Sequence, residues 1–127
     1  MGNGTSIGRV RGLGSAKHGA HHWLMQRFTA IGNIVLVPFL LFSLALMPDL
    51  HYDTVHAWVA KPLPATALIL LIISTFWHAR LGVQVMLEDY LHEHATKFFA
   101  LALLNLVPLA GAAFGILSVL RIALGGA

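Results

Sequence analysis

The sequence predicts an all-α membrane protein with three transmembrane helices. Hydrophobic residues occupy 57% of the 127 positions and charged residues only 10%, whereas soluble domains carry about 25% charged residues. Three apolar stretches reach the length of about 20 residues that a helix needs to cross a hydrocarbon core of roughly 30 Å. We therefore expect spans near residues 26–48, 62–90 and 97–121, within one anchor domain over residues 24–121.

The first span has the clearest limits. No residue between Arg27 and Asp49 carries a formal charge, and the run IVLVPFLLFSLALM forms the core of this stretch. A proline inside a membrane helix is tolerated because neighbouring groups satisfy the freed backbone. We therefore expect Pro38 to kink this span without ending it.

The second and third spans differ in the residues that they carry. The second begins at Pro62, continues past a single arginine, Arg80, and holds the only histidine inside a span, His78. The third is bracketed by Lys97 and Arg121 and contains several glycines and alanines. Small residues allow helix backbones to approach closely in a membrane, so this span is expected to pack tightly.

Basic residues predict the orientation of the chain. Four of them precede the uncharged stretch of the first span, whereas the loop after this span offers one lysine, Lys61. The positive-inside rule therefore predicts a cytoplasmic N-terminus. Residues 1–23 would form a cytoplasmic tail, residues 88–97 a cytoplasmic link, and residues 122–127 a short tail on the outer side. The four basic residues are Arg9, Arg11, Lys17 and Arg27.

Composition excludes several classes of function. The chain has no cysteine, which rules out disulfides, thiolate metal sites and iron–sulfur ligation by its own residues. A single domain of this size leaves no room for a separate catalytic domain, so any catalysis would be shared with partners. The formal charge is +3, but the basic residues flank apolar segments and form no stripe with aromatic residues. Nucleic-acid binding is therefore not expected.

His78 is the main candidate functional residue, because an ionisable side chain inside a span is costly unless it faces a partner, water or a cofactor. Neutral imidazole is a good axial ligand of haem iron, so His78 is a candidate metal ligand. A second histidine ligand would have to come from another polypeptide or a second copy, since no other span contains histidine. The alternative is a hydrogen bond from His78 to a helix hydroxyl, with Ser74 as the candidate.

Helical geometry predicts which residues share the face of His78. At about 100° per residue, Gly82 and Asp89 lie near that face, and Gly82 would leave space beside a flat macrocycle. Tyr90 falls roughly 18 Å along the axis from His78, near the cytoplasmic interface, where its phenol could donate a hydrogen bond. An ordinary tyrosine of the interfacial aromatic belt is the alternative.

Arg27 and His21, at the start of the first span, are further candidates. At the depth of the interface, the planar guanidinium of Arg27 could bind haem propionates or anionic headgroups, or extend toward membrane lipid. Histidines also gather at positions 18, 21 and 22 and in His92-Glu93-His94. Neither group has the carboxylate or cysteine companions of familiar metal sites, so metal binding is not expected there.

The segment HARLGVQVMLEDY, residues 78–90, resembles the second-helix signature of the hydrophobic anchor subunits of succinate dehydrogenase, respiratory complex II, and specifically of the D-type anchor. The family pattern of a histidine, a glycine and an Asp-Tyr pair is matched by His78, Gly82, Asp89 and Tyr90. The entrance to the first span is similar too, with the family's G-x-H, arginine and T-A pair matched by Gly19, His21, Arg27, Thr29 and Ala30.

The resemblance implies a subunit without an active site of its own, in the heteromeric helix bundle of a succinate:quinone oxidoreductase. Haem b would be bound by His78 and by a histidine of a C-type cytochrome b anchor subunit, with Arg27 and His21 at the propionates. Tyr90, supported by Asp89, would hydrogen-bond ubiquinone, which receives electrons from succinate through a flavoprotein and an iron–sulfur subunit. The implied location is the bacterial inner membrane, because the N-terminal segment is short and unlike a transit peptide.

Other functions are open at this point. Arg80 lies outside the family pattern, and its partner could be a propionate, a lipid phosphate or Glu88. In a small multispan transporter, His78 and Arg80 would line a polar pathway. A purely structural membrane subunit would carry no haem, and a homodimeric b-type cytochrome would use His78 from each of two copies.

Overall fold

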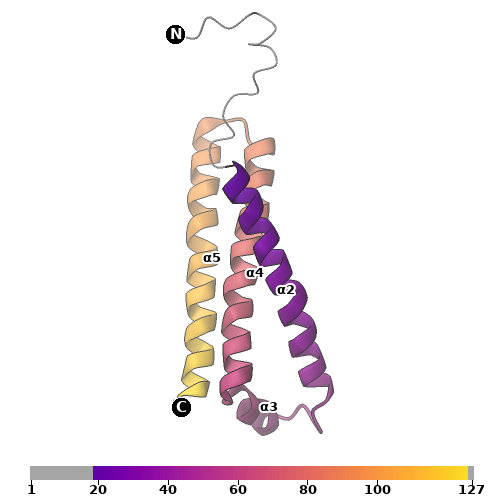
Figure 1. Ribbon diagram of the computed structural model, residues 1–127. Coiled ribbons are helices and arrows are strands. Elements are labelled where there is room, and N and C mark those ends of the chain that lie inside the picture. The colour runs from indigo at the N-terminus through magenta and orange to yellow at the C-terminus, as the bar shows by residue number, and fades with distance from the viewer. Residues whose placement is uncertain (1–18, 126–127) are drawn as a thin grey trace, which may run out of the picture.

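The computed structural model describes residues 19–125, which form four helices joined by short turns (Figure 1). These are α2 (Gly19–Ala45), α3 (Tyr52–Val59), α4 (Pro62–Tyr90) and α5 (His94–Ala123). Helices α2, α4 and α5 are long and apolar enough to cross a membrane, which confirms the predicted fold class. The basic residues of the expected tail at positions 9, 11 and 17 lie outside the described residues.

Helix α4 is the middle helix of the bundle. It packs against α2 on one side and α5 on the other, whereas α2 and α5 do not contact each other in the described part of the chain. Figure 1 shows α2 crossing α4 at an angle, so that its N-terminal half lies close to α4 and its C-terminal end lies apart. Polar contacts from α4 therefore have to reach two different neighbouring helices.

The helix ends differ from the expected span limits at two places. Helix α2 begins at Gly19 and ends at Ala45, against an expected span of 26–48, so residues 19–23 are helical. Helix α5 runs from His94 to Ala123, against 97–121. Hydropathy marks the part of a helix that crosses hydrocarbon, whereas these helices continue as polar turns beyond it. The limits of α4 coincide with the expected 62–90.

Glu93 caps the start of α5. Its carboxylate accepts hydrogen bonds from the backbone amides of Ala95 and Thr96, two donors that have no partner within the helix. Hydrogen bonds from Thr96, and then from Ala95, hold the pKa of the Glu93 carboxyl below its ordinary value. This cap explains why the helix starts before the apolar stretch does.

Helix α3 is a short element that the sequence did not lead us to expect in the link after the first span. It packs against both α4 and α5, and Val59 forms a small buried cluster with Ala65 and Val119. A helix of two turns with a polar first turn has no hydropathy signal of its own, because it is stabilised by tertiary packing. The cluster fixes the end of the bundle opposite the start of α2.

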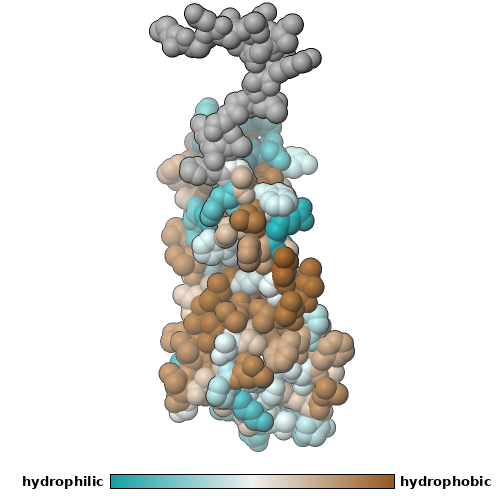
Figure 2. Space-filling model, in the orientation of Figure 1, coloured by the Kyte–Doolittle hydropathy of each residue, from teal (hydrophilic) through white to brown (hydrophobic). Residues whose placement is uncertain are grey.

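Burial inside the chain is slight. The buried apolar residues are few, namely Leu40, Val59, Ala65, Ala67, Leu81 and Val119, and most large hydrophobic side chains are exposed. Figure 2 shows hydrophobic residues gathered over the middle of the visible face and hydrophilic residues toward its ends. This distribution suits a chain whose apolar surface is covered by lipid or by other membrane helices.

Glycine permits the close approach of α4 and α5, as the small residues of the third span predict. A Cβ atom built at Gly111 would lie 2.7 and 2.8 Å from two ring carbons of Phe76, and one at Gly115 would lie 3.2 Å from Ile72. The Phe76 ring therefore occupies the space that any other residue at position 111 would need.

We predict that Gly111→Val destabilises the bundle, because overpacking of a tight contact costs about 1–3 kcal/mol. The free energy of unfolding in lipid bicelles, followed by circular dichroism, measures this cost. Ala110→Val is the matched control, because Ala110 is exposed and the same β-branched residue is introduced. Equal effects of the two substitutions would contradict the assigned role of the Gly111–Phe76 contact.

Candidate functional site

Four polar side chains form a seam between α2 and α4, which we call the α2–α4 polar seam: Gln26, Thr29, Ser74 and His78. The Oγ1 atom of Thr29 lies 2.9 Å from Nδ1 of His78, and the Ser74 hydroxyl donates to the Thr29 carbonyl oxygen over 3.0 Å. The Gln26 amide nitrogen lies 3.5 Å from Nε2 of His78. Spacings of three and four residues place each pair on one face of its helix.

The structure identifies the hydroxyl that contacts His78, and the sequence-based candidate was wrong. Ser74 lies one turn earlier on the same helix, but its hydroxyl bonds to the Thr29 backbone and not to the imidazole. The hydroxyl beside His78 is that of Thr29, which comes from the neighbouring helix. The imidazole is therefore held between two helices.

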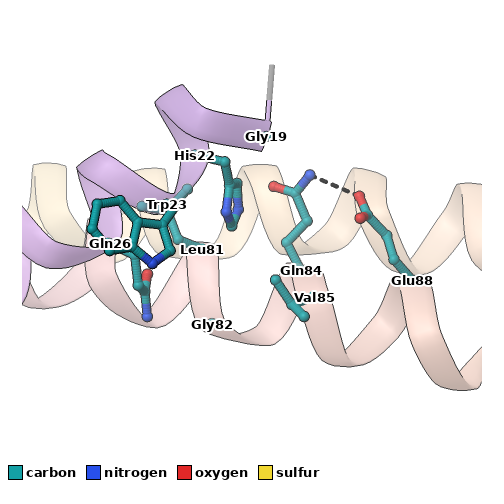
Figure 3. A pocket seen from close by; sticks show the side chains of 9 residues that line it. All are labelled: Gly19, His22, Trp23, Gln26, Leu81, Gly82, Gln84, Val85 and Glu88. Atoms are coloured by element: carbon teal, nitrogen blue, oxygen red, sulfur yellow. Dashed lines mark hydrogen bonds between the residues drawn. The ribbon is translucent and has the colours of Figure 1, made fainter. Parts of the chain in front are cut away.

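A hollow of about 630 Å³ adjoins this seam, between the first turns of α2 and the second half of α4. Figure 3 shows His22 and Gln26 reaching from α2 toward α4, and Gln84 hydrogen-bonded to Glu88. The volume is typical of small-molecule sites. The lining residues are Gly19, His22, Trp23, Gln26, Leu81, Gly82, Gln84, Val85 and Glu88.

Two buried polar atoms in the hollow have no hydrogen-bond partner in the described residues, Nε2 of His22 and Oε1 of Gln26. Buried polar groups are usually satisfied by protein, water or a ligand. A Cβ atom at Gly82 would meet only the Gln26 amide, at 3.5 Å, so this stretch of α4 leaves room for a flat group. These polar atoms and the glycine suit a flat group that carries polar substituents.

The predicted residues of α4 fall into two places. Gly82 and His78 both adjoin Gln26, so they lie on the side of α4 that faces α2, as their spacing predicts. Asp89 and Tyr90 lie at the C-terminal end of α4 and are exposed, Tyr90 by 78%. Among the described residues neither side chain makes a hydrogen bond, so both are accessible to a ligand or partner at this end of the bundle.

The predicted residues of α2 do not gather at His78. The guanidinium carbon of Arg27 lies 5.4 Å from the centroid of the Trp23 ring, and its position is about 160° around the helix from Thr29. His21 is exposed and lines a separate, smaller hollow of about 200 Å³. Within this chain Arg27 thus faces away from α4, toward lipid or another subunit.

Sequence reasoning missed the residues of α2 that do face α4. These are His22, Gln26 and Thr29, which lie four and then three positions apart. Such spacing places them along one face of a helix, and this polar stripe was the signal that could have identified them. Thr29 was noticed only as one half of a T-A pair.

Arg80 contacts a different helix from His78. Its Nε and Nη2 atoms both donate hydrogen bonds to Oδ1 of Asn105 on α5, and the distance from Nε is 2.7 Å. The amide nitrogen of Asn105 in turn donates to the carbonyl oxygen of Leu101 on its own helix. Glu88, one of the partners considered for Arg80, instead accepts a hydrogen bond from Gln84. His78 thus bonds to α2 and Arg80 to α5, although Arg80 also lines the smaller hollow with His21 and His22 of α2.

Within residues 19–125, no three histidine, cysteine, aspartate or glutamate side chains lie close enough together to hold a metal ion. Glu93 of the His92-Glu93-His94 run is engaged as the cap of α5. A metal at this site would therefore have to be held by His78 together with ligands from outside these residues.

The comparisons with known proteins agree with this architecture. Residues 1–114 match the model of the succinate dehydrogenase/fumarate reductase transmembrane subunit family. The chain is 33% identical over 87 residues to the succinate dehydrogenase hydrophobic membrane anchor subunit of Rickettsia bellii, covering 68% of this chain and 70% of that protein. It is 31% identical over 94 residues to the anchor subunits of Rickettsia conorii, covering 73% and 75%, and of Reclinomonas americana, covering 72% and 78%.

The chain belongs to the family of succinate dehydrogenase and fumarate reductase transmembrane subunits. Within this family it is a hydrophobic membrane anchor subunit of succinate dehydrogenase, which agrees with its three apolar spans and its largely exposed apolar surface. An anchor subunit works in a complex with other subunits.

We predict that the Arg80–Asn105 contact couples α4 to α5. Arg80→Met and Asn105→Leu should each destabilise the subunit, and the double variant should lose less than the sum by about 0.6–1.7 kcal/mol, the range measured for polar contacts between membrane helices. Free energies of unfolding in bicelles give this coupling. The pair Arg80→Met and Ser118→Ala is the control, because the Ser118 hydroxyl bonds within its own helix. Additive losses for Arg80 and Asn105 would contradict the coupling.

Proposed function

We propose that this anchor subunit binds haem b through His78, jointly with a C-type cytochrome b anchor subunit, and contributes to the site where ubiquinone is reduced with electrons from succinate. The observation that carries the proposal is the position of His78. Its imidazole lies in the middle part of a membrane helix, contacts Thr29 of a neighbouring helix, and lies 3.5 Å from Gln26, which lines a hollow with unpaired polar atoms. Haem b, when bound, supplies one-electron redox chemistry at its iron.

The second iron ligand is proposed to come from the partner anchor. Helices α2, α4 and α5 carry no other histidine in their apolar middle portions, so this chain supplies one ligand. The large apolar side chains left exposed on the bundle provide a surface on which another set of membrane helices can pack. Arg27 and His21 are exposed near the start of α2, and each could donate hydrogen bonds to the haem propionates, which are carboxylates.

Tyr90 and Asp89 are the residues proposed for the quinone site. The Tyr90 hydroxyl is exposed at the end of α4, where it can donate a hydrogen bond to a quinone carbonyl, and the adjacent Asp89 carboxylate is exposed as well. The hollow between α2 and α4 opens at this same end of α4. Both residues are thus at the end where a partner's electron donor could approach.

The same end of the bundle is proposed to face the cytoplasm of a bacterial cell, with the chain in the inner membrane. The basic residues that precede the first span favour this orientation. It would bring Tyr90 to the side where the iron–sulfur and flavoprotein subunits bind, so that electrons reach the quinone without crossing the membrane. His78 and Arg80 lie on the same helix but bond to different neighbouring helices, which disfavours a transporter in which both line one pathway.

We predict that His78→Ala removes or displaces the haem while the subunit still inserts and assembles. The measurement is the reduced-minus-oxidised absorption spectrum of the purified complex, scaled to the amount of this subunit. His51→Ala is the control, because His51 is an exposed histidine that precedes α3. A normal haem spectrum in the His78→Ala complex would exclude His78 as the ligand, and the purely structural subunit would then be the better description.

We predict that Tyr90→Phe slows quinone reduction but not succinate oxidation with an artificial electron acceptor. Loss of one neutral hydrogen bond costs about 1 kcal/mol, which is roughly a fivefold loss in kcat/KM for quinone. Tyr52→Phe is the matched control, since Tyr52 is equally exposed, at 78%, at the other end of the bundle. Equal losses in both assays, or an equal effect of Tyr52→Phe, would contradict the quinone role of Tyr90.

A further inference from the structure

We infer that Thr29 is a positioning residue for His78: its hydroxyl accepts the Nδ1 proton of the imidazole and so leaves Nε2 unprotonated for the iron. This inference rests on the proposed haem site, but it concerns a residue of the neighbouring helix and the choice of tautomer. A histidine ligand needs a defined tautomer, and the hydrogen bond made by its other ring nitrogen sets that tautomer.

The single hydrogen of the Thr29 hydroxyl determines the direction of the contact. The Oγ1 atom donates to the Met25 carbonyl oxygen, over 2.9 Å, and to the Gln26 carbonyl oxygen, over 3.1 Å. Because these two carbonyls of its own helix share the only hydroxyl proton, Oγ1 meets the imidazole with a lone pair. The 2.9 Å contact to Nδ1 is then a hydrogen bond that His78 donates.

The other side of the ring agrees with this assignment. Gln26 presents its amide nitrogen, a donor, to Nε2 of His78 over 3.5 Å, a distance beyond the range of ordinary hydrogen bonds. Nε2 is therefore an acceptor atom without a strong partner, whereas Nδ1 is firmly held. The nitrogen left available is the one farther from the backbone, on the side of Gln26.

The Ser74 hydroxyl contacts the backbone of Thr29 and not its side chain. It donates to the Thr29 carbonyl oxygen over 3.0 Å, and a Cβ atom built at Gly32 would lie 3.0 Å from the Ser74 oxygen. The first bond ties α2 to α4 beside the imidazole, and Gly32 allows the two helices to approach closely enough for it. Thr29 and Ser74 thus have separable roles, one toward the ring and one toward the docking of the helices.

A hydrogen bond accepted from Nδ1 makes the imidazole a stronger electron donor, which favours the oxidised iron. Replacing Thr29 with valine keeps the shape of the side chain but removes the acceptor. In the assembled complex, Thr29→Val should therefore raise the midpoint potential of the haem and weaken haem affinity about 10–100-fold, as loss of such supporting groups does at metal sites. Redox titration and haem retention during dilution measure the two effects.

Two control variants separate this role from general packing. Thr29→Ser keeps the hydroxyl and should restore a potential and affinity close to those of the unaltered complex. Ser74→Ala removes the bond between the helices without touching the ring, so it should leave the potential unchanged. An unchanged potential in Thr29→Val, failure of Thr29→Ser to restore it, or an equal shift in Ser74→Ala would overturn the inference.

The tautomer can also be measured without haem. Nitrogen-15 NMR of the full chain in lipid bilayers, with the His78 signals assigned by their loss in His78→Ala, should show a protonated Nδ1 and an unprotonated Nε2. A protonated Nε2 would overturn the role of Thr29. Absence of haem from the unaltered complex would instead contradict the proposed function, while the NMR result would still decide the tautomer.

Discussion

A polar side chain inside the hydrocarbon layer has to find its hydrogen-bond partners within the protein, because no water is present to replace them. Helix α4 carries two ionisable side chains in its middle part, His78 and Arg80, and each bonds to a different neighbour. Thr29 of α2 meets His78, and Asn105 of α5 meets Arg80. This constraint places α4 in the middle of the bundle and sets the rotation of the two outer helices around it.

The chain is only a part of a larger apolar assembly. Apart from the small cluster around Val59 and the tight Gly111–Phe76 approach, its helices bury few side chains against one another, and most large apolar residues are exposed. Lipid can cover part of this exposed apolar surface. Because the chain belongs to a family of anchor subunits, other subunits of the complex can cover the rest. The site around His78 is likewise one-sided, with a hollow and unpaired polar atoms beside it.

Much of the fold could be predicted from the sequence because hydropathy alone identifies three spans, and helical spacing places Gly82 on the face of His78. The polar contacts between the helices depend on how each helix is rotated about its axis. This rotation cannot be read from a single sequence. That rotation decides that Thr29, and not Ser74, meets His78, and that Arg80 meets Asn105. The short helix α3 was missed for a related reason, since tertiary packing stabilises it and hydropathy does not mark it.

The central claim is that this anchor holds one haem b together with a second, different anchor subunit. The most direct test is to purify the complex gently through a tag on this chain, record its haem spectrum, count haem per copy of the chain, and identify the polypeptides that accompany it. We predict one haem b for each copy, together with a flavoprotein, an iron–sulfur subunit and a second small anchor. A colourless complex, or one haem shared by two copies of this chain, would contradict the account.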